Sequence, residues 1–99
     1  MNRLYLKWKW SRIYKAILSY EVISPDNWKE FKPILIEALV LSSMVDNNMS
    51  RLRATIYALR IIKDNQGFLL NEVEVPDVFY RDLVWSVECL IDPRKALVC

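Results

Sequence analysis

The sequence contains no histidine, a single glycine and two cysteines among its 99 residues. The missing histidine excludes histidine-dependent catalytic triads, histidine general bases and the usual zinc sites. Cys89 and Cys99 show neither a disulfide framework nor a metal-ligand spacing, so both are predicted to be free thiols. The single glycine, Gly67, leaves little of the backbone freedom that loop-rich or disordered chains use. Most of the chain is therefore predicted to be regular secondary structure.

Long apolar runs are also absent. The longest stretch without a charged residue runs only from Ala38 to Val45, whereas a helix needs ~20 apolar residues to cross a bilayer. No secretory signal pattern opens the chain. These absences predict an intracellular, soluble protein without a membrane span.

Apolar residues are abundant, at 54% of a chain whose length suits one helical domain over residues 1–99. Globular chains usually contain ~45–50%. A homodimer interface would bury the surplus, so a homodimer is predicted. The four tryptophans and five tyrosines add to this prediction, because aromatic residues at a surface are typical anchors of protein interfaces.

The net charge of +2 is unevenly distributed along the chain. Residues 1–20 and 51–63 contain basic but no acidic residues. In residues 64–92, by contrast, every charged residue except Arg81 is acidic. This segregation predicts a molecule with basic and acidic surfaces in different places.

Apolar residues at spacings of four and three predict a first helix from about Tyr5 to Val22. Its inward face consists of Leu6, Trp10, Ile13, Ile17 and Tyr20. The opening residues also alternate between apolar side chains and Lys7 or Lys9, which is typical of a strand. The alternative is therefore a strand over residues 1–10, with the helix beginning at Ser11.

Ser24, Pro25 and Asp26 are predicted to start a second helix, because serine caps helices, proline suits the first helical position and an acid suits the helix dipole. Pro33 either kinks this helix, or the helix ends near Phe31 and a new one begins with Pro33 in its first turn. In both cases one face is shared by Trp28, Phe31, Leu35, Ala38 and Leu39.

The polar residues 46–48 are predicted to end that segment, and Asp46 or Ser50 to cap a third helix that runs to about Lys63. The predicted inward face of this third helix consists of Leu52, Ile56, Leu59 and Ile62.

Gly67 is predicted to end the third helix, and residues 68–75 to form a minor extended segment or one arm of a small β-hairpin. Such a strand would pair with residues 1–10, if those are extended, or with its own copy in a dimer. A last helix is predicted from Pro76 to about Ile91, ended by Asp92 and Pro93, with Phe79, Leu83, Val87 and Leu90 inward. The predicted fold class is mainly α, with about four helices.

The basic, aromatic N-terminus is the first candidate surface. On a helix, Trp8 falls off the inward face and lies near Arg12 and Lys15. Cations with an exposed aromatic ring suit nucleic acid or an anionic membrane surface. The alternative is that Trp8 packs under a neighbouring element and that the cations are a solvated face.

The second candidate surface is a basic stripe formed by Arg53, Tyr57 and Arg60, which lies about a quarter turn from the predicted inward face of the third helix. It could grip a phosphate backbone, or form salt bridges with the acidic segment from Glu72 to Glu88, which is the interpretation favoured here. No helix-turn-helix, zinc-finger or ribonucleoprotein signature accompanies the stripe.

A set of acids is the third candidate group, since carboxylates can hold Mg²⁺ as they do in nucleases. Its members are Glu72, Glu74, Asp77 and Asp82. The alternative is that acids on a strand block edge pairing or face a basic partner.

The whole chain resembles the small orphan proteins of filamentous viruses that infect hyperthermophilic, acidophilic archaea, the lipothrixvirus and rudivirus group. The likeness rests on the length, the single glycine, the opening from Leu4 to Trp10 and the Ile- and Arg-rich helix from Arg51 to Lys63. The resemblance implies a viral protein in the host cytoplasm, with relatives that bind nucleic acid or interfere with host defence. It offers no motif from which a functional residue could be assigned.

These observations predict a protein that is not an enzyme, has no cofactor and serves as a protein-interaction module, for a host protein or for itself. The surface candidates for that role are Trp8, Arg53, Tyr57 and Arg60. The alternative is nucleic-acid binding through Lys7, Lys9, Arg12, Lys15 and the basic stripe. A metal-dependent nuclease is ranked last.

Overall fold

The computed structural model describes residues 3–20, 22–64 and 75–97, and within them four α-helices follow one another. They are α1 (Arg3–Leu18), α2 (Trp28–Asn47), α3 (Arg51–Asp64) and α4 (Tyr80–Ile91). Short 3-10 helices, Asp77–Phe79 and Pro93–Leu97, lie before and after α4. The described residues contain no strand, so the predicted mainly α fold is confirmed.

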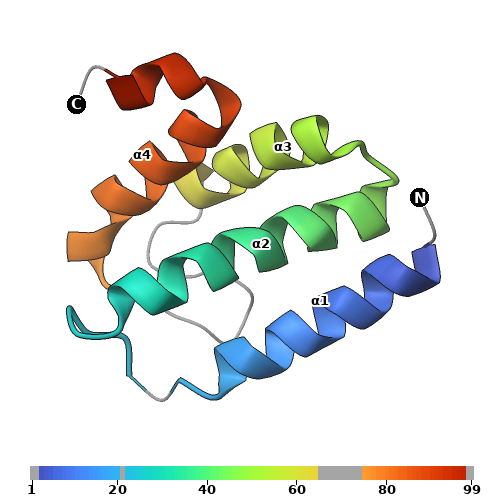
Figure 1. Ribbon diagram of the computed structural model, residues 1–99, viewed down its shortest axis with the longest axis horizontal. Coiled ribbons are helices and arrows are strands. Elements are labelled where there is room, and N and C mark those ends of the chain that lie inside the picture. Colours follow the sequence, from blue (N-terminus) through green and yellow to red (C-terminus); the bar gives the residue numbers. More distant parts are fainter. Residues whose placement is uncertain (1–2, 21, 65–74, 98–99) are drawn as a thin grey trace.

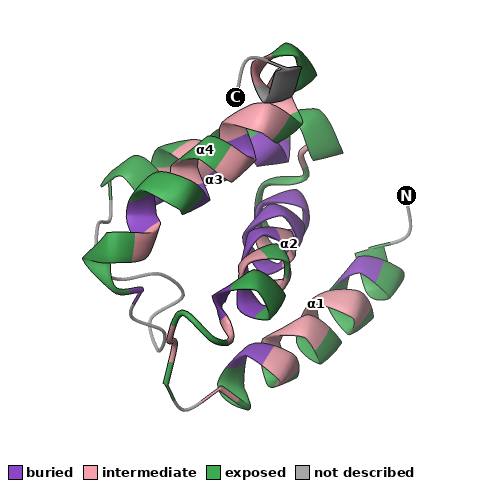
Figure 2. Cartoon of the chain, turned by 60° about the vertical axis from the view of Figure 1, so that its left-hand side comes forward, coloured by how far each residue is buried: buried purple, intermediate pink, exposed green. Residues whose placement is uncertain are grey.

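The helix α2 lies at the centre of the molecule (Figure 1). The helix α1 runs antiparallel to it on one side, and α3 and α4 lie on the other side. Figure 2 shows that buried residues continue around most of α2, whereas α1 is exposed along its outer side. A helix that is apolar on most of its surface is stable only with neighbours on several sides, which explains the central place of α2.

The predicted first helix is confirmed, but it ends at Leu18, four residues before the predicted end at Val22. Residues 3–10 are helical, so the alternative strand over residues 1–10 is wrong. Leu6 and Ile17 are buried, and Trp10 and Ile13 are half-buried against the same core. The guanidinium of Arg3 donates a hydrogen bond of 2.9 Å to the carbonyl of Val45, in the last turn of α2. That carbonyl has no partner within its own helix, so the contact fixes the start of α1 against the end of α2.

The start of α2 is later than predicted, because residues 25–27 form a turn. The backbone carbonyl of Ser24, rather than its hydroxyl, accepts hydrogen bonds from the N–H groups of Asn27 and Trp28. The Asn27 side chain in turn accepts one from the Ser24 N–H, at 2.9 Å. The helix then continues through Pro33, so the predicted end near Phe31 is wrong. It ends, as predicted, in residues 46–48, where Asn48 adopts a left-handed conformation (φ 51°).

The predicted inward face of α3 is wrong for two of its four residues. Leu52 is 60% exposed and Ile56 is 40% exposed. Small residues face the core instead, and the buried residues of α3 are Ala54, Thr55, Ala58 and Ile62. Side chains this short let the backbone of α3 approach the core closely, which leaves the larger aliphatic side chains on the outer side.

The last helix is confirmed, but residues 77–79 are 3-10 and Leu90 is 59% exposed instead of inward. Tyr80 is buried beside Leu83 and Val87. The helix ends before Pro93 as predicted, with Asp92 extended (φ −130°, ψ 93°), the conformation that a following proline favours.

Some of the sequence predictions concern residues that the structure does not describe. Gly67 and the predicted extended segment over residues 68–74 lie outside the described residues, as does Cys99. Val75 is described, and it is buried without regular secondary structure. Cys89 is a free thiol, as predicted. In the described part of the chain, no helix has the length and apolar character needed to cross a bilayer.

Candidate functional site

The structure divides the predicted site residues between two helices, α1 and α3, which are separated by α2 (Figure 1). The residues on α1 are Lys7, Trp8, Lys9, Arg12 and Lys15; the residues on α3 are those of the basic stripe, Arg53, Tyr57 and Arg60.

Trp8 is 55% exposed on the outer side of α1, so the interpretation that it packs under a neighbouring element is wrong. The guanidinium carbon of Arg12 lies 5.0 Å from the centre of the Trp8 ring, within the range of a cation–π contact. The Tyr5 ring lies 6.2 Å from Trp8 on the other side along the helix. Two half-exposed aromatic rings and one cation therefore form a continuous patch.

This patch is the rim of a groove between α1 and α2, which we call the aromatic groove. It is lined by Tyr5, Trp8, Lys9, Arg12, Ile13, Ala16 and Ile34, and its volume is about 410 Å³. Ile13, Ala16 and Ile34 are half-buried and form an apolar floor. The contribution of Ile34 was missed from the sequence, because only the packing of α1 on α2 brings that residue to the groove.

The cations of α1 do not form one face. Lys7 and Lys9 are two positions apart, which places them on nearly opposite flanks of the helix. Lys9 lies 3.9 Å from the Glu37 carboxylate, whereas Lys7 lines a second groove with Trp10 and Asp46. Among the described residues, Arg12 and Lys15 have no acidic group within 4 Å.

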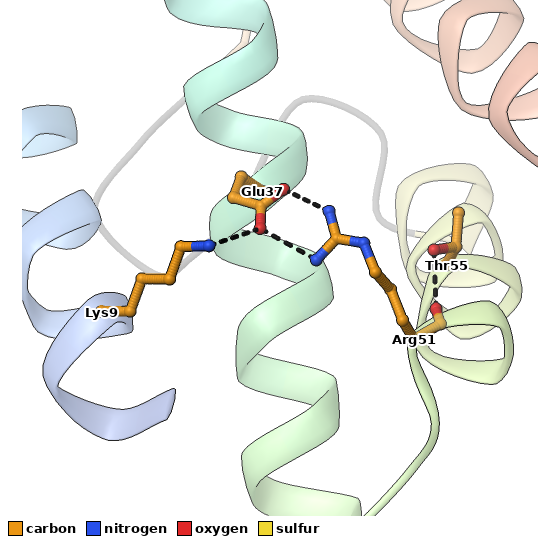
Figure 3. Close-up of polar contacts among 4 residues, drawn as sticks. All are labelled: Lys9, Glu37, Arg51 and Thr55. Atoms are coloured by element: carbon orange, nitrogen blue, oxygen red, sulfur yellow. Dashed lines mark hydrogen bonds and ion pairs between the residues drawn. The ribbon is translucent and has the colours of Figure 1, made fainter. Parts of the chain in front are cut away.

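Glu37 is the centre of a charge cluster that joins three helices (Figure 3). Arg51, from the first turn of α3, donates two hydrogen bonds to this carboxylate, at 3.0 and 2.5 Å. Lys9 approaches it from α1. The hydrogen bond from Arg51 lowers the pKa of Glu37 below its ordinary value, and the pKa of Arg51 is raised in return. The cluster therefore links the three helices by ion pairs. Because Lys9 is paired with Glu37, it is less available to bind a ligand.

The lowered pKa of Glu37 predicts how stability responds to acid. The ionised carboxylate stabilises the fold above its unfolded-state pKa, and this stabilisation is lost as the pH falls from about 4.5 through the folded-state pKa. We expect Glu37→Gln to lower the free energy of unfolding at pH 7 by about 1 kcal/mol and to flatten its decrease in acid. Urea unfolding at a series of pH values measures both effects.

The matched control for that prediction is Asp26→Asn, which changes an exposed acid without an ion pair in the described part of the chain. At pH 7 this variant should lower the free energy of unfolding by less than Glu37→Gln does. A Glu37→Gln curve parallel to that of the parent would contradict the role assigned to the cluster.

The basic stripe on α3 is exposed along its length. The ion pair that joins α3 to α4 is formed by Lys63 and Glu88, at 3.7 Å, and not by the arginines of the stripe. Among the described residues, Arg53 and Arg60 have no acidic group within 4 Å, and the predicted partners Glu72 and Glu74 lie outside that part of the chain.

The acids predicted as metal ligands are only partly described. Asp82 accepts hydrogen bonds of 2.8 Å from the Lys32 ammonium and from the Trp28 indole N–H, and these bonds lower its pKa. In the described ranges, no three side chains that could bind a metal gather in one place. Glu72 and Glu74 lie outside them.

The aromatic groove is therefore the site in the described part of the chain where exposed aromatic rings, an apolar floor and the guanidinium of Arg12 coincide. Comparison with protein families, with curated proteins and with solved structures finds no match to this chain.

Proposed function

We propose that this chain is a non-enzymatic protein-interaction module whose aromatic groove binds an acidic segment of a partner protein. The observation that carries the proposal is the half-exposed Trp8 ring, held by Arg12 at the rim of a groove with an apolar floor. Tryptophan, tyrosine and arginine are the residues that most often dominate the free energy of binding at protein interfaces.

The chemistry of the groove defines the kind of segment that fits it. The half-buried Ile13 and Ile34 favour a bulky apolar side chain, because such a side chain would displace water from apolar surface. Arg12 and Lys15 lack acidic neighbours among the described residues, so a carboxylate next to that side chain would complement them. The fitting ligand is a short acidic segment with one large apolar anchor.

Nucleic-acid binding is the second candidate, and it is favoured by four cations that have no ion pair within the described ranges, Arg12, Lys15, Arg53 and Arg60. These residues lie on two surfaces separated by α2, however (Figure 1). The phosphate backbone of one nucleic-acid strand bound along the aromatic groove would therefore not reach all of them. One face of Trp8 is also occupied by Arg12, which reduces the area on which a base could stack. The groove therefore supports a protein partner better.

The resemblance to proteins of archaeal filamentous viruses supports a more specific proposal. It suggests a host protein as the partner and the cytoplasm of the host cell as the location.

The experiment is a titration of the ¹⁵N-labelled chain with three probes, in which binding is monitored by the amide chemical shifts of the chain. The probes are a peptide with a central leucine flanked by glutamates, the same peptide with lysines in place of glutamates, and a single-stranded oligothymidylate. We expect the acidic peptide to shift the amides of the aromatic groove and the lysine peptide to leave them unchanged. Trp8→Ala and Arg12→Glu should each weaken binding at least tenfold, or by about 1.4 kcal/mol.

Two control variants match these substitutions in type. Trp85→Ala removes another half-exposed tryptophan, on α4, and Lys29→Glu reverses another exposed cation, on α2. Both should bind the peptide as the parent does. Preferential binding of oligothymidylate with a steep loss of affinity in salt would replace the proposal with the second candidate, since phosphate contacts release counterions. No shift in the groove with any probe would contradict both.

A further inference from the structure

The outer side of α3 carries a line of four exposed side chains at spacings of four, three and four residues. They are Arg53, Tyr57, Arg60 and Asp64, and we call them the α3 seam. This spacing keeps all four on one side of the helix and is the spacing by which helices pair along a common line. At 1.5 Å per residue, the seam spans about 17 Å.

The α3 seam is complementary to itself when two copies run antiparallel. A two-fold axis midway between Tyr57 and Arg60 brings Arg53 opposite Asp64 of a second copy, and Tyr57 opposite Arg60 of that copy. Each copy then contributes to two ion pairs at the ends and two cation–π contacts at the centre. A parallel pairing would instead place like charges together.

The groups of the seam are available for such contacts. In the described part of the chain, neither the seam arginines nor Asp64 has an ion pair within 4 Å. Lys63, next to the seam, is directed to Glu88 on α4. Ile56 lies beside the seam as an exposed aliphatic side chain that a second copy would cover. We infer that α3 is the surface on which two copies of this chain pair antiparallel.

The dimer should be weak, because one face of a helix buries less than the ~800 Å² per partner of a standard interface. It should also leave the aromatic groove open, since most of the groove-lining residues belong to α1. The helix α1 lies across α2 from α3 (Figure 1). A dimer of this kind presents two grooves, so a partner with two acidic segments would bind it more tightly than a partner with one.

The test is sedimentation equilibrium of the full chain, under reducing conditions, from about 10 µM to about 1 mM, a range suited to small interfaces. We expect a reversible monomer–dimer equilibrium. Arg53→Asp and Asp64→Arg should each raise the dissociation constant at least tenfold, because each creates two like-charged pairs. The double variant Arg53→Asp/Asp64→Arg should restore dimerisation to within about threefold, because it restores both pairs with their signs exchanged.

Lys29→Asp is the matched control, since it reverses an exposed cation outside the seam and should not change the equilibrium. Circular dichroism of each variant shows whether the helices are retained. A wild-type chain that sediments as a monomer throughout the range would overturn the inference. So would a double variant that dimerises as poorly as the single variants.

Discussion

Leu83→Ala should lower the free energy of unfolding by about 3–5 kcal/mol, whereas Leu90→Ala should change it by less than about 0.5 kcal/mol. Both leucines are on α4, and the periodicity of the sequence places both on its inward face. In the structure Leu83 is completely buried among the core residues, and Leu90 is largely exposed. The first substitution removes many apolar contacts and leaves a cavity, whereas the second truncates a side chain that lies mostly in solvent.

Urea unfolding followed by circular dichroism measures this difference, with the two variants compared at one low protein concentration. A loss of this size is a large part of the stability of a small domain, so the Leu83 variant should unfold at a much lower urea concentration. Equal costs for the two leucines would show that α4 is rotated about its axis relative to the structure described here.

Trp28→Phe should lower the free energy of unfolding by about 1.5–3 kcal/mol more than Trp10→Phe. The indole N–H of Trp28 donates a 2.8 Å hydrogen bond to the Asp82 carboxylate, and its ring stacks on Phe79 with 4.7 Å between ring centres. The indole nitrogen of Trp10 is buried and has no hydrogen-bond partner among the described residues. Replacing Trp10 therefore removes an unsatisfied donor, which offsets part of the lost apolar contact.

The comparison is informative because the same atoms are removed at both positions. Repeating Trp28→Phe in an Asp82→Ala background isolates the hydrogen bond, and its cost should then decrease by about the same 1.5–3 kcal/mol. If Trp28→Phe costs the same with and without Asp82, the hydrogen bond does not stabilise the protein and ring packing accounts for the whole effect.

Much of the fold could be predicted from the sequence because local signals were strong. The apolar spacing of Leu6, Trp10, Ile13 and Ile17 identified α1, and Asp92 before Pro93 identified the end of α4. Errors arose where two local signals competed. Ser24 and Pro25 together resemble a helix start. The Asn27 side chain, however, accepts a hydrogen bond from the Ser24 N–H and stabilises a turn over residues 25–27 instead.

The sites were predictable in part for the same reason. Helical spacing alone placed Trp8 off the inward face and beside Arg12, and the structure shows that contact. The ion pair between Lys9 and Glu37, which makes Lys9 less available to a ligand, could not be predicted. Glu37 is far from Lys9 in the sequence and approaches it only when α1 packs on α2. The floor of the aromatic groove depends on Ile34 for the same reason.

The sequence by itself determined that this protein is helical, where most of its helices lie, and that its charges are segregated, since these properties follow from residue type and short-range spacing. Only the tertiary structure decided which sides of α3 and α4 face inward. Periodicity identifies an apolar side of a helix, but the neighbouring helices select which residues fit against them. On α3 the small Ala54 and Ala58 were selected over Leu52 and Ile56, because short side chains permit closer packing.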